Sequence, residues 1–427
     1  MIKIIHLSDL HFSSGAIDDS SGGGHNFEVL CALTEYLKDI SFDKLIITGD
    51  LTDSGTPGAF QNVSTWLSSE VATNMSKKIG LKIEDSSKFL VVPGNHDLYD
   101  NEDSIVFPNF IQKQGKYYYK CFLSTPFFSI LKKDGISIVF FGIDSGKSGT
   151  PAKGEIDEDD LHFINLHCND GRRYGLIDEI TGFSLTKDEF KNAVKVLVLH
   201  HHFFKKKHQI SNKWLKMQNT KSALSLLFIN DFSLALSGHK HIDYFDSISF
   251  SSALDNRSIA RYAYYYLARK NNIMKNIRLY RNDGKLYSRK QSFVIQLKYF
   301  AEKIGLTRES DLEEQSIRTG LKAYAKKQFK NYKSKMEELT EEIVRNVKNI
   351  INNCNFNYIV GNTTAKIRGP SASYIRENSF NEITFKKEDE NIFFTIDKHF
   401  YDNTTRSFKK EPFTKKFYIF QPIKFNL

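Results

Sequence analysis

Short runs of apolar residues recur along the first 241 residues, and each is followed by a polar block. A continuous apolar run of strand length predicts a buried strand, whereas apolar residues spaced three to four positions apart predict a helix. Strand and helix patterns alternate here, which predicts βαβ units with mainly parallel pairing and right-handed crossovers. The apolar runs that precede polar blocks are Ile2–Leu7, Leu45–Thr48, Phe89–Val92, Val194–Leu199 and Phe232–Leu236.

Helices and further strands fill the intervals between these runs. A second helix is expected from Ala59 to about Lys78, and Ile136–Ile143 is a further strand that ends in Asp144. The first helix is predicted by the spacing of Phe27, Leu30, Leu33, Leu37 and Ile40. After residue 241 we expect short antiparallel strands that complete a second sheet and close a first domain at residue 290: Ile248–Phe250, Tyr262–Ala268, Ile277–Tyr280 and Lys285–Ser288.

Residues 291–427 are expected to form a second domain of α+β structure. At 427 residues the chain exceeds what one hydrophobic core usually supports. Residues 293–352 read as helix, and the apolar stripe over 317–351 predicts a core face or a homo-oligomer contact. A loop is expected over Gly361–Ser373. An antiparallel meander should follow, with strands at Ile383–Lys387, Ile392–Tyr401 and Lys416–Phe425.

The net charge is unevenly distributed along the chain. It is +10 overall, and residues 291–427 hold 24 Lys and Arg against 17 Asp and Glu, a net charge of +7. A basic region favours a polyanionic partner such as nucleic acid. The charges are mixed rather than clustered, however, so an ordinary solvated surface is an equally good interpretation.

The sequence favours a cytoplasmic protein without a membrane partner. No segment approaches the roughly 20 consecutive apolar residues of a membrane span. Residues before the first polar block leave no room for a signal peptide. The cysteines lie far apart without a CxxC pair, which predicts reduced, structural thiols at Cys31, Cys121, Cys168 and Cys354.

Each of the five apolar runs delivers residue types that bind metals. Ligands bind at the carboxyl edge of open α/β sheets, so side chains that follow the strands should converge there. Imidazole, carboxylate and amide oxygen suit borderline divalent ions such as Mn, Fe, Zn or Ni. The order of the blocks predicts a metal site that hydrolyses phosphate esters: Asp9-Leu10-His11, Gly49-Asp50-Leu51-Thr52-Asp53, Gly94-Asn95-His96-Asp97, His200-His201-His202 and Gly238-His239-Lys240-His241.

Asp50 is the best candidate for a ligand shared by two metals, because a carboxylate can bridge with its two oxygens. The spacing of two residues within each D-x-H or H-x-H pair places both side chains on one face of an extended segment. Whether His200 or His201 is the ligand stays open, since both follow the same strand. One metal would then be completed by Asp9, His11 and His241, and the other by Asn95, His200 and His239.

The blocks resemble those of the calcineurin-like metallophosphoesterase superfamily: D-x-H, G-D-x-x-D, G-N-H-[DE], H and G-H-x-H. The resemblance covers about residues 1–290 and implies a four-layer α/β/β/α sandwich with two divalent metal ions, of which we expect Mn. It implies in-line attack of a metal-bridging hydroxide, with His96 contacting the phosphate or protonating the leaving oxygen. Asp53 stands where the family's serine/threonine phosphatases have the carboxylate that orients that histidine. The implied metal ligands are Asp9, His11, Asp50, Asn95, His200, His239 and His241.

Departures from that family's phosphatases favour a phosphodiester substrate. Ser54-Gly55 stands where the serine/threonine phosphatases carry Arg-Gly, and Asp97 stands where they have Glu. A monoester dianion benefits from a guanidinium clamp, and no Arg lies in any of the five blocks. Residues 143–165 also resemble a segment of bacterial cyclic-nucleotide phosphodiesterase-like members. We therefore expect a phosphodiesterase that acts on nucleotides or nucleic acid.

Three other functions stay open. A nuclease would use the basic C-terminal domain to hold its polyanion. A phosphomonoesterase would act on protein or nucleotides, and a non-catalytic interaction module would keep the fold alone, as in the retromer subunit. Aromatic residues among lysines over residues 101–135, including Phe127 and Phe128, would either grip single-stranded nucleic acid or form a small satellite core.

Overall fold

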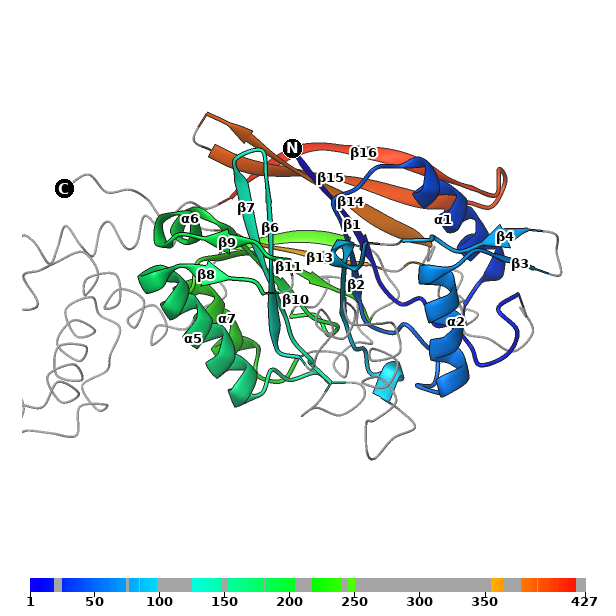
Figure 1. Ribbon diagram of the computed structural model, residues 1–427, viewed down its shortest axis with the longest axis horizontal. Coiled ribbons are helices and arrows are strands. Elements are labelled where there is room, and N and C mark those ends of the chain that lie inside the picture. The colour runs from blue at the N-terminus through cyan, green and yellow to red at the C-terminus, as the bar shows by residue number, and fades with distance from the viewer. Residues whose placement is uncertain are drawn as a thin grey trace, which may run out of the picture. The chain divides into compact units, whose positions relative to one another are not determined.

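The structure is a computed structural model with two six-stranded sheets and flanking helices (Figure 1). No helix among the residues it describes is long and apolar enough to cross a membrane. The described residues are 1–18, 25–73, 77–83, 85–98, 125–146, 153–179, 181–203, 217–239, 244–249, 355–361, 363, 378–389 and 391–419.

The first sheet combines strands from both ends of the described chain, in the order β16-β15-β14-β1-β2-β5. Strands β1, β2 and β5 are parallel, as predicted, and β14 pairs antiparallel with β1, with Ile383 opposite Ile4. The strands are β1 (Ile2–Leu7), β2 (Lys44–Thr48), β5 (Phe89–Val92), β14 (Ser379–Glu388), β15 (Asn391–Asp402) and β16 (Ser407–Tyr418).

The second sheet has the order β12-β13-β11-β10-β7-β6. Strands β13, β11, β10 and β7 are parallel to one another, and β6 pairs antiparallel with β7. The strands are β6 (Phe127–Lys133), β7 (Ile136–Gly142), β10 (Val194–Val198), β11 (Phe232–Ser237), β12 (Tyr244–Ser249) and β13 (Asn355–Val360).

Alternation of side chains along the strands builds two cores. Ile4 points into a core that also holds Val196 and Leu236 of the second sheet, so the two sheets face each other. Ile5 points the other way and packs with Leu33 of α1 and Trp66 of α2. Helices α5 and α6 flank the second sheet, which confirms the predicted four-layer sandwich. The helices are α1 (Phe27–Asp39), α2 (Pro57–Ser68), α5 (Glu158–Tyr174), α6 (Lys187–Asn192) and α7 (Thr220–Ile229).

Helix ends follow the capping residues in the sequence. The Asn26 side chain accepts from the backbone at the start of α1, and Asp157 does the same for α5. Helix α2 ends ten residues earlier than predicted, because the chain turns at Ser69 into a short hairpin. The remaining short elements are β3 (Val71–Ala72), β4 (Lys78–Ile79), β8 (Leu176–Ile177), β9 (Ser184–Leu185) and the 3-10 turns η1 (Ser86–Lys88) and η2 (His96–Leu98).

The predicted domain boundary at residue 290 is corrected by the strand pairing. Strands β14, β15 and β16 extend the first sheet beyond β1, and β13 lies next to β11 in the second sheet. The backbone divides into one unit of Met1–Ala223, Asn230–Ser247 and Phe356–Leu427, and another of Leu224–Ile229 and Ile248–Asn355. The described part of the predicted C-terminal domain therefore completes the N-terminal sheets.

Other expectations are confirmed or corrected in detail. The meander is confirmed, but its third strand begins at Ser407 rather than Lys416. Strand β16 contains Lys409, Lys410 and Pro412, and it is last in the strand order, where an edge strand tolerates such residues. Phe127 belongs to β6 and is buried between the sheets. The helix over 293–352 and residues 101–124 lie outside the described residues.

Candidate metal centre

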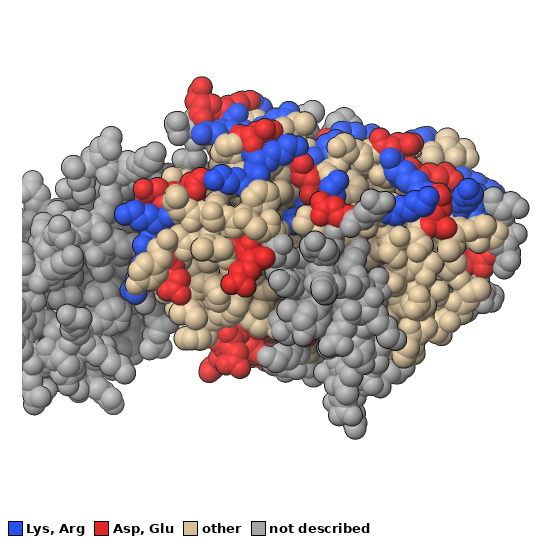
Figure 2. All heavy atoms as spheres, viewed as in Figure 1, with Lys and Arg blue, Asp and Glu red and all other residues tan. Residues whose placement is uncertain are grey.

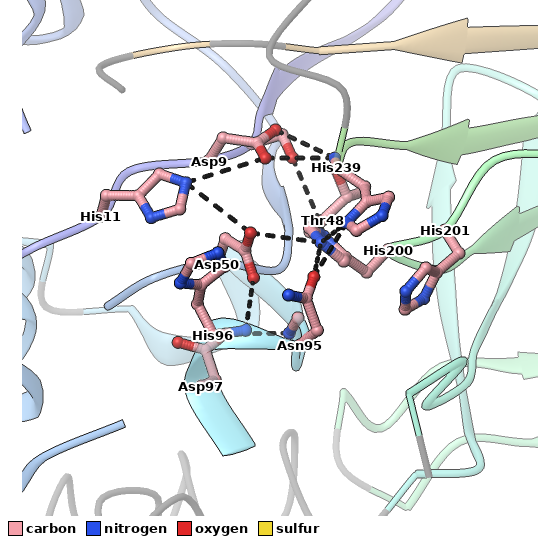
Figure 3. Close-up of polar contacts among 12 residues, drawn as sticks. Asp9, His11, Thr48, Asp50, Asn95, His96, Asp97, His200, His201 and His239 are labelled. Carbon is pink, nitrogen blue, oxygen red and sulfur yellow. Dashed lines mark hydrogen bonds and ion pairs between the residues drawn. The ribbon is translucent and has the colours of Figure 1, made fainter. Parts of the chain in front are cut away.

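The ends of five parallel strands bring the predicted ligands together (Figure 3). Asp9 and His11 follow β1, Asp50 follows β2, and Asn95 and His96 follow β5. The second sheet contributes one residue after β10 and one after β11. His96 and His239 are half-buried. The other predicted ligands in the cluster are buried: Asp9, His11, Asp50, Asn95 and His200.

Backbone conformation in this cluster is unusual. Asp9, His11, Asp50 and His239 have positive φ angles of 55°, 53°, 51° and 76°. Residues other than glycine seldom adopt this region, and such residues concentrate at functional sites. Gly94 must lack a side chain, because a Cβ there would lie 2.2 Å from Asp50 N and Asp50 Oδ1. The turns that follow the strands can therefore pack closely against one another.

Asp50 and His200 lie at the middle of the cluster. Asp50 Oδ2 is 3.3 Å from His200 Nε2 and 3.6 Å from His11 Nε2. His200 Nε2 is also 3.0 Å from Asn95 Oδ1 and 3.1 Å from His239 Nδ1. The His239 Nδ1 to Asn95 Oδ1 distance is 2.8 Å. Several lone-pair donors of different strands therefore face the same small volume.

A backbone carbonyl orients the ring of His200. His200 Nδ1 donates to the carbonyl of Thr48 at 2.7 Å, and a carbonyl can only accept. In the neutral ring, Nε2 then carries a lone pair that faces the acceptors Asp50 Oδ2 and Asn95 Oδ1. A cation bound between Nε2 and these two oxygens would satisfy all three groups at once. Carbonyl contacts of this kind fix the tautomer of metal-binding histidines.

The pKa values reflect crowded charges at a buried site. Burial raises the pKa of Asp9 to about 7, with Asp50 adding to the effect and His200 opposing it. Burial by itself lowers the pKa of His200, but the charges of Asp50 and Asp9 outweigh it and raise that pKa to about 9. Burial and the neighbouring histidines hold the pKa of His239 well below its usual range. A field that retains a proton on His200 also favours a metal cation.

The residues present fit divalent metals. Two groups of side chains have ligand atoms within 4.8 Å of one another: His11, Asp50 and His96, and Asp50, His200 and His239. Asp50 belongs to both, as expected of a bridging ligand. Its buried Oδ2 atom has no hydrogen-bond partner among the described residues. Imidazole, carboxylate and amide donors suit Mn, Fe, Zn or Ni.

Asp97 connects two of the turns that carry ligands. Its carboxylate accepts hydrogen bonds from Gly94 N at 2.9 Å, Leu51 N at 3.2 Å, and Thr52 N and Thr52 Oγ1 at 2.9 Å each. Burial, with the charge of Asp50 as a second cause, raises the pKa of Asp97 to about 6. The sequence placed Asp97 in a block but gave no reason for its role.

His96 is held through the backbone rather than as the sequence suggested. His96 Nδ1 donates to the Asp53 carbonyl oxygen at 2.9 Å, whereas the Asp53 carboxylate accepts from Ser54 Oγ at 3.0 Å. The His96 backbone N–H donates to Asp50 Oδ1 at 3.0 Å. The expected orienting role of Asp53 is therefore carried by its main-chain oxygen.

His200 and His201 lie in different surroundings. His200 lies in the cluster, whereas His201 Nδ1 is 2.9 Å from the hydroxyl of Ser145. The rings of His201 and His239 are 4.4 Å apart, so His201 borders the cluster. His241, the remaining predicted ligand, lies outside the described residues, as does Lys240.

The sequence matches one known protein family over most of the residues that form this site. The family model described as calcineurin-like phosphoesterase matches residues 2–243, which is more than half of the chain. The chain belongs to the calcineurin-like phosphoesterase family. Members of this family typically depend on a dinuclear metal centre. No curated protein sequence matches the chain.

Similar solved structures share little sequence with this calcineurin-like phosphoesterase. A putative 5'-nucleotidase from Staphylococcus aureus is 12% identical, with a TM-score of 0.35, 57% of this chain covered and 46% of that one. A purple acid phosphatase from yellow lupin (Lupinus luteus) seeds is 8% identical, with a TM-score of 0.38 and coverage of 92% and 51%. The chain thus spans about half the length of each.

Proposed function

We propose that this calcineurin-like phosphoesterase hydrolyses phosphodiesters of nucleotides or nucleic acid at the cluster around Asp50. The supporting observation is the scarcity of guanidinium groups. The only arginines before residue 257 are Arg172 and Arg173. Arg172 pairs with Asp231, which directly precedes β11, whereas the cluster lies beyond the other end of that strand. A diester carries one negative charge and needs a guanidinium clamp less than a monoester dianion does.

The chain's own residues would divide the work. Asp9, His11, Asp50, Asn95, His200 and His239 would hold two metal ions, with Mn the ion we favour. When bound, such ions lower the pKa of water and neutralise charge on phosphoryl oxygens. His96 would donate a proton to the leaving oxygen. Its Nδ1 is engaged by the Asp53 carbonyl, which directs that transfer through Nε2.

The described C-terminal strands give no separate argument for nucleic acid. Several of their lysines are paired with acidic side chains, among them Lys410 with Asp397 at 2.6 Å and Lys416 with Glu388 at 2.8 Å. Figure 2 shows Lys and Arg interspersed with Asp and Glu over this region. A nuclease would instead show strong dependence of substrate binding on salt concentration.

The test is hydrolysis of a matched panel by the Mn-loaded full chain. The panel contains bis-p-nitrophenyl phosphate, p-nitrophenyl phosphate, cyclic AMP, and single- and double-stranded oligonucleotides. We expect turnover of the diester without turnover of the monoester, and Asp50→Asn should lower the rate at least about 100-fold. A preference for the monoester would contradict the proposal.

The role of His96 has its own signature. A His96→Gln variant should slow hydrolysis of diesters with a poor alkoxide leaving group about 10²- to 10⁴-fold, the usual contribution of general acid catalysis. The effect on p-nitrophenyl diesters should be much smaller, because that leaving group departs without a proton. Equal losses for both leaving groups would exclude the assignment.

A further inference from the structure

Strand β13 brings a late segment of the chain to the edge where the metal-binding residues lie. It is parallel to β11, with Val360 opposite Ser237, so both strands end at the same edge. Gly361 N donates to the carbonyl of Ser237 at 2.9 Å. Thr363 comes next among the described residues and is fully buried. This segment lies outside residues 2–243, which the family model covers.

Thr363 holds the backbone of Ser8 by two hydrogen bonds. Ser8 N donates to Thr363 Oγ1 at 3.0 Å, and Thr363 N donates to the carbonyl of Ser8 at 2.9 Å. Both residues are fully buried, so water cannot replace either contact. Both polar groups of the Ser8 backbone are thus fixed by one residue that is 355 positions away in sequence.

Ser8 in turn contacts other parts of the centre. Its hydroxyl donates to the Thr48 carbonyl at 3.1 Å, and that same carbonyl accepts from His200 Nδ1. Gly238 packs directly on Ser8, since a Cβ on Gly238 would lie 1.7 Å from Ser8 Oγ and 2.7 Å from Asp9 Oδ2. Ser8 is therefore the point at which three ligand-bearing turns meet.

Asp9 depends on this support. Its φ of 55° is a strained conformation that persists only where the surroundings impose it. Thr363 fixes the residue before it, and Asp9 N donates to the Gly49 carbonyl at 3.1 Å. The Asp9 carboxylate also accepts from His239 N, at 3.1 and 3.2 Å to its two oxygens.

We propose that Thr363 is a positioning residue of the metal centre, which holds Ser8 so that Asp9 presents its carboxylate to the cluster. The inference rests on the proposed function only for its metal-binding step. It requires no particular substrate. It also gives β13 a role in the centre, although this strand lies more than 100 residues beyond the last motif.

The test compares Mn²⁺ affinity in three variants of the full chain after metal removal. Thr363→Val keeps the shape and the backbone contact but removes the acceptor for Ser8 N, and Thr363→Ser keeps the hydroxyl. Thr34→Val is the matched control, because Thr34 is buried in α1 and its hydroxyl accepts from Trp66 Nε1 at 2.9 Å. Thermal unfolding midpoints are measured in parallel.

We expect Thr363→Val to weaken binding of at least one Mn²⁺ ion about 10- to 100-fold, as loss of an outer support usually does. Thr363→Ser should bind as the wild type does, and Thr34→Val should lower the unfolding midpoint without changing Mn²⁺ affinity. Unchanged affinity in Thr363→Val, or an equal loss in Thr34→Val, would overturn the inference. A wild-type chain that binds no Mn²⁺ would overturn it too. A chain that binds Mn²⁺ but hydrolyses no phosphoester would refute only the proposed function.

Discussion

At the scale of single residues, the centre combines ligands that motifs reveal with supports that motifs miss. Asp50 could be singled out from the sequence, because its block and the blocks of Asp9 and Asn95 each follow a predicted strand. Nothing in the sequence distinguishes the carbonyl of Thr48 as the group that orients His200. Such supports act through backbone atoms that every residue type carries, so residue identity does not announce them.

Asp97 provides a test of support at this scale. An Asp97→Asn variant keeps one acceptor oxygen but turns an NH₂ group toward buried N–H donors that the carboxylate satisfies. We expect the free energy of unfolding to fall by about 1–3 kcal/mol, the usual penalty for an unsatisfied buried donor. Urea denaturation of the metal-free protein measures it.

The matched control is Asp53→Asn in the turn after β2, whose residues Leu51 and Thr52 donate to Asp97. The Asp53 carboxylate contacts only the adjacent Ser54 hydroxyl among the hydrogen bonds described above. The main-chain oxygen of Asp53 accepts the hydrogen bond from His96 Nδ1, and the substitution retains this oxygen. Its unfolding free energy should change by no more than about 0.5 kcal/mol. If the two variants were equally stable, the role assigned to Asp97 would be wrong.

At the scale of elements, apolar periodicity identified the buried strands well. The boundaries of β1 and β5 match the predicted runs because most side chains on both faces of these strands are apolar and buried. Strand β6 was missed because its aromatic residues were assigned to an insertion. Strand β16 was misplaced because an edge position accepts charges that a central strand excludes.

Pairing between distant strands was beyond the reach of local patterns. Strand β14 was visible by itself, but nothing in its pattern indicates that its partner is β1, more than 370 residues earlier. Phe380, Ile383 and Phe385 of β14 are fully buried in the cores on the two faces of the first sheet. The meander is consequently part of the fold that holds Asp9.

A chain truncated after residue 290 tests this point. It lacks the buried side chains of β13 to β16, among them Ile359, Phe380, Ile383, Phe385 and Phe394. Burial of five such side chains contributes about 7–15 kcal/mol, which is comparable to the entire stability of a domain, about 5–15 kcal/mol. We expect the truncated chain to lack a cooperative unfolding transition when followed by circular dichroism. Cooperative unfolding near the midpoint of the full chain would restore the boundary at residue 290.

At the scale of the whole molecule, the two sheets act as one frame for the centre. The first sheet supplies Asp9, His11, Asp50 and Asn95, and the second supplies His200 and His239. Asp50 belongs to both candidate metal-binding groups, one with His11 and His96 and the other with His200 and His239. We therefore propose that the Asp50 carboxylate would bind to both metal ions.

Mn²⁺ binding to the metal-free full chain tests this claim most directly, with wild type, Asp50→Asn and His239→Ala compared by equilibrium titration. We predict two Mn²⁺ ions per wild-type chain, as in dinuclear centres generally. Asp50→Asn should weaken both ions, whereas His239→Ala should weaken mainly one. Two ions bound to Asp50→Asn with wild-type affinity would contradict the account.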